Sequence, residues 1–256
     1  MRPVVFSASS VNTYQTCHLQ WYFEYVLVDP GIVSEPQIVG QEVHDYAENR
    51  LHWKRDRGWP NLQGRATKPE VGLLYDVFDR DILPTYRDAV LIEAPFQIEV
   101  DGIPFSGVID SVDRQDIPPV PEVDWDGEGR ALIGPPMPAF ANILRDLKTT
   151  GKRPRRGKYW FAMIGYFLGA RDLGFEIDAI QLDYIVRTQH PYYWPEVIPV
   201  PDMGEIATWA GQLHAVAGGV ERADYEPTGL GTYVCKFCPY RNICGPLLRY
   251  NAALDK

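Results

Sequence analysis

Two apolar runs separated by the dipeptide Asp101-Gly102 constrain the fold of this chain more than any other feature. Apolar side chains alternate from Ala89 to Val100, and a second apolar run extends from Ile103 to Val112. Asp-Gly is a preferred two-residue turn between antiparallel strands, because both turn residues must adopt positive φ. The sequence therefore predicts an antiparallel hairpin over these two runs.

Helical periodicity precedes this hairpin. Apolar residues recur at spacings of three and four from Ser9 to Val26, with Ser9 or Ser10 available as N-cap, so this segment is predicted to be an amphipathic helix. A second helix is predicted to start near Gly40, and a third to cover Val71–Tyr86. The polar segment Lys54–Lys68 between them is predicted to be a loop, because three glycine and proline residues interrupt it.

Strands and helices alternate after the hairpin. Strands are predicted over Asn142–Lys148 and Ala179–Thr188, and helices over Tyr159–Asp172 and Met203–Ala223. The proline-rich segment 115–140 lacks either periodicity and is interpreted as a long surface insertion: a lid, a partner surface or a tolerated loop.

Length and composition limit the class of protein. A chain of 256 residues with 45% hydrophobic residues can build one large domain or two small ones. The longest nearly apolar run, Tyr159–Ala170, is shorter than the roughly 18 residues that span a bilayer, and the first residues lack a signal-peptide pattern. We therefore expect no membrane helix and a cytoplasmic location.

The net charge of −9 argues against a protein that coats nucleic acid through bulk electrostatics. Any nucleic-acid contact must then be local. Taken alone, the basic run between the third strand and the following helix is a solvated loop more often than a binding site. Its cations are Lys148, Lys152, Arg153, Arg155, Arg156 and Lys158.

The triplet Asp146-Leu147-Lys148 is the first candidate for catalytic chemistry. Positions i and i+2 of a strand point to the same side, so the carboxylate and the ammonium are expected to lie side by side. A triplet of this kind is expected about once by chance in a chain of this composition, and alone it is better explained as a surface ion pair on a strand.

Further acids and a histidine give the triplet a context. Asp110 ends the second hairpin strand, Glu93 lies on the first, and His44 precedes Glu48 by one helical turn. If the neighbouring strands bring Asp110 and Asp146 together, these carboxylates, the Leu147 carbonyl and the His44 imidazole can bind Mg²⁺ or Mn²⁺. Such an ion generates hydroxide and stabilises the charge of a phosphodiester under attack, and Lys148 would orient the water and neutralise developing charge.

The order of these motifs resembles the RecB-like branch of PD-(D/E)XK nucleases, which includes the RecB and AddB nuclease domains, CRISPR-associated adaptation nucleases and phage exonucleases. The matching motifs are G-x-x-x-H-x-x-x-E at Gly40, His44 and Glu48, G-V-I-D at 107–110, and D-x-K-T at Asp146, Lys148 and Thr149. The opening S-x-S-x-x-x-x-Y-x-x-C at Ser7, Ser9, Tyr14 and Cys17 is similar to the start of the iron–sulfur members.

The resemblance implies an α/β fold with a restriction-endonuclease-like core, in which helices flank a central mixed sheet. It implies one nuclease domain over residues 1–256, with catalytic Asp110, Asp146 and Lys148 and a metal held by His44, Asp110 and Asp146. Two departures are the length of the 115–140 insertion and a missing glutamine. The family's Q-x-x-x-Y motif retains Tyr166, but Ala162 occupies the glutamine position.

All four cysteines belong to one pattern, Cys235-x-x-Cys238-x5-Cys244 with Cys17 far upstream. In an intracellular protein this pattern favours a metal site over disulfides, and its spacing alone fits zinc or a 4Fe–4S cluster equally well. The family resemblance implies the iron–sulfur cluster. The cluster would fasten residues 1–30 to residues 225–250, and these two segments would form a cluster-binding subregion.

We therefore expect a Mg²⁺- or Mn²⁺-dependent DNA exonuclease that acts on single strands or DNA ends in recombination, repair or CRISPR adaptation. Its partners would be DNA and proteins of those pathways. In this context the basic run and Tyr166 are predicted to contact DNA, and Glu48 and Glu93 to support the site. The alternative is a catalytically weak module that binds DNA ends and carries a structural metal cluster.

Overall fold

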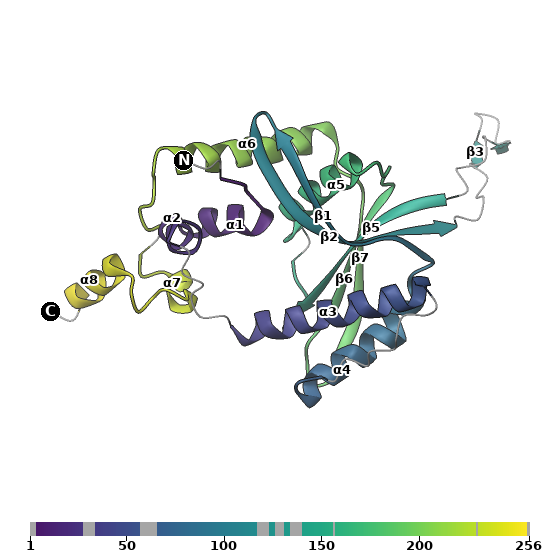
Figure 1. Ribbon diagram of the computed structural model, residues 1–256, viewed down its shortest axis with the longest axis horizontal. Coiled ribbons are helices and arrows are strands. Elements are labelled where there is room, and N and C mark those ends of the chain that lie inside the picture. Colours follow the sequence, from purple (N-terminus) through teal and green to yellow (C-terminus); the bar gives the residue numbers. More distant parts are fainter. Residues whose placement is uncertain are drawn as a thin grey trace.

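A five-stranded mixed sheet in the order β1-β2-β5-β6-β7 forms the centre of the computed structural model (Figure 1). The structure describes residues 4–27, 34–56, 66–116, 123–125, 131–133, 140–155, 157–228 and 230–254. The strands of the sheet are β1 (Asp88–Val100), β2 (Ile103–Asp116), β5 (Phe140–Thr150), β6 (Ala179–Val186) and β7 (Tyr192–Ile198). Only β5 and β6 pair in parallel within this sheet, and α5 (Trp160–Asp172) connects them. The expected α/β class, a mixed sheet flanked by helices, is confirmed.

The predicted hairpin is present as β1 and β2. Asp101 has a φ of 49° and Gly102 a φ of 83°, as a turn with two left-handed residues requires. The tip of this hairpin reaches α6 (Met203–Glu221), where His214 Nε2 lies 3.2 Å from Asp101 Oδ2. The hairpin is therefore held at both ends, by the sheet and by a helix.

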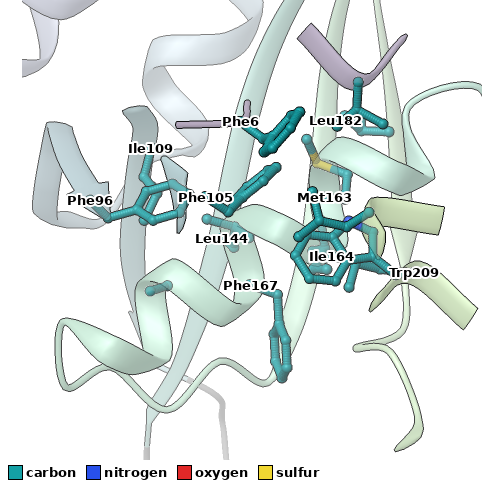
Figure 2. Packing of buried hydrophobic residues seen from close by; sticks show 14 of the residues in the cluster. Phe6, Phe96, Phe105, Ile109, Leu144, Met163, Ile164, Phe167, Leu182 and Trp209 are labelled. Atoms are coloured by element: carbon teal, nitrogen blue, oxygen red, sulfur yellow. The ribbon is translucent and has the colours of Figure 1, made fainter. Parts of the chain in front are cut away.

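Helices cover both faces of the sheet. In Figure 1, α1 (Ala8–Thr16), α5 and α6 lie on one side of the sheet, and α3 (Glu35–Asp56) and α4 (Pro69–Val77) lie on the other. Each side has its own buried apolar cluster. The first cluster contains Phe105, Met163 and Trp209 (Figure 2), and the second contains the predicted apolar stripe of α3: Val43, Ala47 and Leu51.

Helix α5 approaches the hairpin closely because two glycines face it. A Cβ added at Gly165 would lie 2.6 Å from the Phe105 ring, and one at Gly169 would lie 2.4 Å from the Phe96 ring. These positions are one helical turn apart, so the two aromatic rings pack directly against the backbone of α5. Larger residues there would force α5 away from the sheet.

The predicted N-terminal helix is divided into three pieces. Cys17 is extended, with a φ of −161°, and separates α1 from α2 (His18–Trp21), which continues into the π-helical turn η1 (Tyr22–Val26). The N-cap is Ser7, whose hydroxyl accepts from the Ser10 amide while the Ser10 hydroxyl accepts from the Ser7 amide. The prediction of Ser9 or Ser10 as the cap was wrong, because this reciprocal pair satisfies the first amides one turn earlier.

Other boundaries differ from the predictions. Helix α3 begins at Glu35, before Gly40, and the predicted third helix ends in a π turn η2 (Phe78–Ile82) and a 3-10 turn η3 (Leu83–Thr85). Strand β7 was not predicted. It contains Pro195, which lacks an amide donor and is tolerated because β7 is an edge strand.

The proline-rich segment contains regular structure that the sequence did not reveal. Strand β2 continues to Asp116, and β3 (Val123–Trp125) and β4 (Ala131–Ile133) pair as a separate antiparallel sheet. The rest of the predicted insertion, like 57–65 of the predicted loop, lies outside the described residues. The tail beyond α6 contains α7 (Tyr233–Phe237) and α8 (Gly245–Leu254). Among the helices of the described residues, none is long and apolar enough to cross a membrane.

A buried ion network holds β5 against its neighbours. The Arg145 side chain is fully buried and donates to Asp183 Oδ2 and Thr85 Oγ1, both at 2.8 Å. Its guanidinium also lies 3.7 Å from Asp113 Oδ2 and 3.7 Å from the centroid of the Tyr86 ring. Two carboxylates therefore compensate one buried cation, and each depends on the arginine to offset the cost of its burial.

Replacing Arg145 by alanine is expected to lower the free energy of unfolding by about 3–5 kcal/mol, because Asp183 and Asp113 would be left buried without their cation. Urea unfolding of the purified variant measures this loss. Arg80→Ala is the matched control, since Arg80 is exposed and pairs with Asp81 at the surface; it is expected to cost less than about 1 kcal/mol. Equal midpoints for the two variants would contradict this account of the network.

Candidate metal site and cysteine cavity

The candidate metal site lies where β2 and β5 separate. Their ladder ends at the pair Ser111 and Arg145, so the next register position would place Asp110 opposite Asp146. There the Leu147 amide donates to Asp110 Oδ2 at 2.8 Å, in place of a bond between the two backbones. The Asp110 carboxylate is thus fixed by the backbone of the strand that carries Asp146 and Lys148.

Three side chains from three elements surround this point. His44 of α3, Glu93 of β1 and Asp110 of β2 each offer a ligand atom within 4.8 Å of the other two, and His44 Nδ1 lies 3.4 Å from Asp110 Oδ2. Among the described residues, this is the one group of three or more potential ligands with such spacing. An imidazole and two carboxylates in this arrangement can bind a divalent cation.

Glu93 reaches the site through an irregular backbone. Its φ of 44° is left-handed, which costs a residue with a side chain about 1 kcal/mol or more. In a regular strand, residues separated by an even number of positions point to the same face of the sheet. Ile92 and Phe96 are four positions apart, yet Ile92 packs in the cluster beside α3 and α4 and Phe96 packs in the cluster beside α5. β1 therefore changes face at Glu93, directly opposite Asp110 in the register.

Asp146 and Lys148 form the pair that the D-x-K triplet predicts. Lys148 Nζ donates to Asp146 Oδ1 at 2.7 Å and lies 3.4 Å from the Leu147 carbonyl oxygen. The Asp146 side chain is 1% exposed and that of Lys148 is 23% exposed. The other carboxylate oxygen, Asp146 Oδ2, is buried and has no hydrogen-bond partner among the described residues. A buried carboxylate oxygen without a partner is a group that a bound cation would satisfy.

Crowded carboxylates shift the protonation of the site. Burial, reinforced by Asp110 and Glu48, raises the pKa of Glu93 to about 8. Burial also raises the pKa of Asp146, against the opposing effect of Lys148. The pKa of His44 is lowered by burial, although Asp110 counteracts part of that shift, so the imidazole is neutral at pH 7 and can act as a ligand.

The site opens into a hollow that we call the metal-site cleft. It is lined by the polar groups His44, Glu48, Glu93, Asp110, Lys148 and Tyr166, with Ser7, Ala8, Ser9, Gln41 and Asp45 at its rim and Ser106–Val108 along the hairpin. The predicted supporting residue Glu48 and the predicted DNA contact Tyr166 therefore lie in the same cleft as the candidate ligands. Burial raises the pKa of Tyr166 to about 12, with Asp146 adding to the effect, so its hydroxyl remains a donor.

The predicted basic run begins at this site and leads away from it. The Tyr159 ring lies near two of its lysines, with its centroid 5.8 Å from Lys148 Nζ and 4.8 Å from Lys158 Nζ. Arg153 stacks on the Trp194 ring at 3.8 Å. Lys152 and Arg155 are exposed, and Arg156 lies outside the described residues.

The four cysteines line one cavity between the first helices and the C-terminal tail, together with Phe23, Leu230 and Leu247. None forms a disulfide. Burial raises the pKa of Cys238, and the other three cysteines contribute to the rise as neighbouring thiols. Within the described residues, no three of the sulfurs lie mutually within 4.8 Å, so the thiols surround the cavity without forming a tight cluster.

Sequence reasoning underestimated Glu93, which it placed only among supporting residues. The structure brings Glu93, rather than Asp146, into closest association with His44 and Asp110. Glu93 reaches the site because its backbone is left-handed, and the pattern of apolar residues along the strand does not predict this conformation.

Comparisons with known proteins show a shared fold. No family model and no curated protein matches the chain. Among solved structures, SSO0001 superposes with a TM-score of 0.50 and 14% identity, covering 96% of this chain and 88% of its own. The "Putative exonuclease" from Eubacterium rectale gives a TM-score of 0.53 and 17% identity, covering 87% of this chain and 83% of its own. At such identities the likeness concerns the fold alone.

The raised pKa of Glu93 predicts a pH dependence of stability in metal-free protein. The folded protein retains this proton up to about pH 8, whereas the unfolded chain releases it near 4.5. The free energy of unfolding should therefore fall as pH rises through this window, by at most about 1.4 kcal/mol per unit. Urea unfolding in EDTA at pH 5.5 and 7.5 tests it: Glu93→Gln should reduce the fall, and Glu99→Gln, farther along β1, should not. The same pH dependence in Glu93→Gln and wild type would refute the assignment.

Proposed function

We propose that this protein is a metal-dependent deoxyribonuclease of the PD-(D/E)XK type, from the RecB-like branch, that hydrolyses phosphodiester bonds. The observation that carries the proposal is the Asp146–Lys148 pair, 2.7 Å between Oδ1 and Nζ, beside the group formed by His44, Glu93 and Asp110. Acids and an imidazole that can hold a divalent cation, with one lysine beside them, can carry out metal-dependent phosphodiester hydrolysis.

A divalent cation fits these residues. His44, Asp110 and Asp146 would hold it, with Glu93 adjacent, and the orphan Asp146 Oδ2 would gain a partner. Oxygen ligands with one imidazole suit Mg²⁺ or Mn²⁺. When bound, the cation would supply an activated water and stabilise the charge that develops on the phosphate.

Lys148 has a separate role in the reaction. Burial alone would lower its pKa, but Asp146 and Asp110 outweigh burial and raise it, so the side chain remains an ammonium ion. Held by Asp146 and partly exposed to the metal-site cleft, it orients the attacking water and neutralises charge on the phosphate as the P–O bond to the leaving oxygen breaks. A planar guanidinium would not fit this compact position as well.

The basic run supports DNA as the substrate. Lys148 Nζ and Lys158 Nζ lie 5.8 Å and 4.8 Å from the centroid of the Tyr159 ring, so the run has cations near the site, and each contact with a phosphate would steepen the salt dependence of binding. We propose an exonuclease that acts on single strands or DNA ends in recombination, repair, phage or CRISPR adaptation pathways, with the proteins of those pathways as partners. Residues 1–256 would act as one nuclease domain.

The four cysteines would hold a 4Fe–4S cluster. They are the only cysteines of the chain and all line one cavity. The spacing of the cysteines along the chain fits zinc as well as a 4Fe–4S cluster, and the resemblance to the iron–sulfur nucleases favours the cluster. Such a cluster would join residues 1–30 to 225–250, and its binding energy would add to folding.

Asp146→Ala and Lys148→Ala are each expected to lower DNA cleavage by about 10²- to 10³-fold or more, because each removes charge stabilisation at the reacting phosphate. Cleavage is measured with 5′- and 3′-labelled single- and double-stranded oligonucleotides in Mg²⁺ and Mn²⁺. Lys68→Ala, at the surface pair with Glu35, is the control and should cleave like wild type. Full activity in either site variant would contradict the assignment; binding without turnover in wild type would favour a DNA-end-binding module.

Anaerobically purified protein is expected to be brown, with broad visible absorption and about four irons per chain. Cys244→Ser should lose this colour and unfold at lower urea, because the cluster would lose a ligand. Metal analysis of the same sample discriminates the alternatives. A colourless protein that carries stoichiometric zinc on its thiols would refute the cluster.

A further inference from the structure

A second hollow meets the metal-site cleft at Ser9 and is lined by residues of α1, α3 and the cysteine-bearing tail. This α1–α7 groove is about 1400 Å³ including its open mouth, and Ser9 lines both hollows. Gln37 lines the groove, and Gln41, His44 and Glu48 follow it at helical spacing along α3 into the cleft.

The groove has the chemistry of a nucleic-acid surface. Its walls offer neutral polar groups such as Asn12 and Gln37, and its far end offers Lys236 and Arg241, with Glu24 as the opposing acid. Arg241 Nη1 donates to the Lys236 backbone carbonyl at 3.2 Å, which holds the Arg241 side chain against α7. The tail 227–254 contains three basic residues and no acidic one, in a chain with a net charge of −9.

Two aromatic rings are exposed on α7 beside these cations. Tyr233 is 74% exposed and Phe237 is 70% exposed, and their centroids are 4.8 Å apart, one helical turn from each other. The core does not use these rings, although large aromatic side chains are normally among the best buried. Exposed aromatics next to cations are the features by which proteins bind single strands, because bases stack on rings while cations contact phosphates.

We propose that the α1–α7 groove binds a single DNA strand whose end lies in the metal-site cleft. Bases stack on Tyr233 and Phe237, and Lys236 and Arg241 contact the adjoining phosphates. From Gln37 to Glu48, α3 extends roughly 16 Å, so the strand is held several nucleotides away from the reacting bond. This inference deepens the proposed nuclease function and rests on it for the location of the strand end.

Binding can be measured without cleavage. Anisotropy of a fluorescein-labelled oligo-dT is recorded in EDTA with the cluster-loaded protein. Tyr233→Ala/Phe237→Ala is expected to weaken binding about tenfold or more, because each stacked base contributes substantially to affinity. Met203→Ala is the matched control, since Met203 is 77% exposed at the start of α6; it should bind like wild type. Phe237→Trp should also retain affinity, because it preserves a stacking surface.

The cations are tested in the same assay. Lys236→Ala should weaken binding and flatten its salt dependence, whereas Lys68→Ala should leave both unchanged. Helix α7 adjoins two of the proposed cluster ligands, so a substitution there could also remove the cluster. The visible absorption of each variant is therefore compared with that of wild type. If the alanine variant loses its colour, Phe237→Trp is the variant used to test stacking. Loss of affinity in Phe237→Trp as large as in the alanine variant would overturn stacking.

The outcomes separate this inference from the nuclease assignment. A wild-type protein that binds oligo-dT through Tyr233 and Phe237 but cleaves nothing would retain the groove and reject the nuclease. Unchanged oligo-dT affinity in the double variant would reject the groove, whatever the cleavage activity. Equal weakening for a blunt duplex and for oligo-dT would also reject a groove for a single strand.

Discussion

The ladder between β2 and β5 ends at Ser111 and Arg145, and the next amide of β5 that faces β2, that of Leu147, donates to the Asp110 carboxylate at 2.8 Å. Leu147 is buried, and a buried amide without a partner is costly, so this bond stabilises the separation of the strands. The same bond orients Asp110. The metal-site cleft lies where β2 and β5 separate. Its acid Asp110 accepts the hydrogen bond that the Leu147 amide would otherwise give to the backbone of β2.

Consecutive residues of β5 serve two buried charge systems on opposite sides of the sheet. Arg145 is compensated by Asp183 and Asp113, while Asp146 pairs with Lys148 toward the cleft. Adjacent side chains of a strand point to opposite faces of the sheet, so Arg145 and Asp146 belong to different systems. The first has paired charges and holds the strand in place. In the second, burial and neighbouring carboxylates raise the pKa of Glu93 and Asp146, and Asp146 Oδ2 has no hydrogen-bond partner among the described residues, which fits a cation site.

Opposite charges are also separated over the molecule as a whole. The chain is acidic overall, yet two of its segments are basic: the run that begins at Lys148 in the cleft and contains Lys158, and the tail, whose Lys236 and Arg241 line the α1–α7 groove. A polyanion would therefore be attracted locally while the net negative charge limits non-specific binding. Under the proposed function, the carboxylates would hold a cation in the cleft, and the basic segments would supply affinity for a phosphate backbone.

The sequence by itself determined features that depend on near neighbours. The i and i+2 spacing placed Asp146 beside Lys148, and Asp101-Gly102 specified a turn with two positive φ angles; both are local rules of strand geometry. Only the tertiary structure decided that β1 changes face at Glu93, that an edge strand accommodates Pro195, and that a polar groove leads to α7. These features arise from contacts between segments far apart in the chain, such as α5 pressing on the hairpin and α3 crossing the opened sheet. Periodicity along the chain encodes which residues are buried, but not which distant surface buries them.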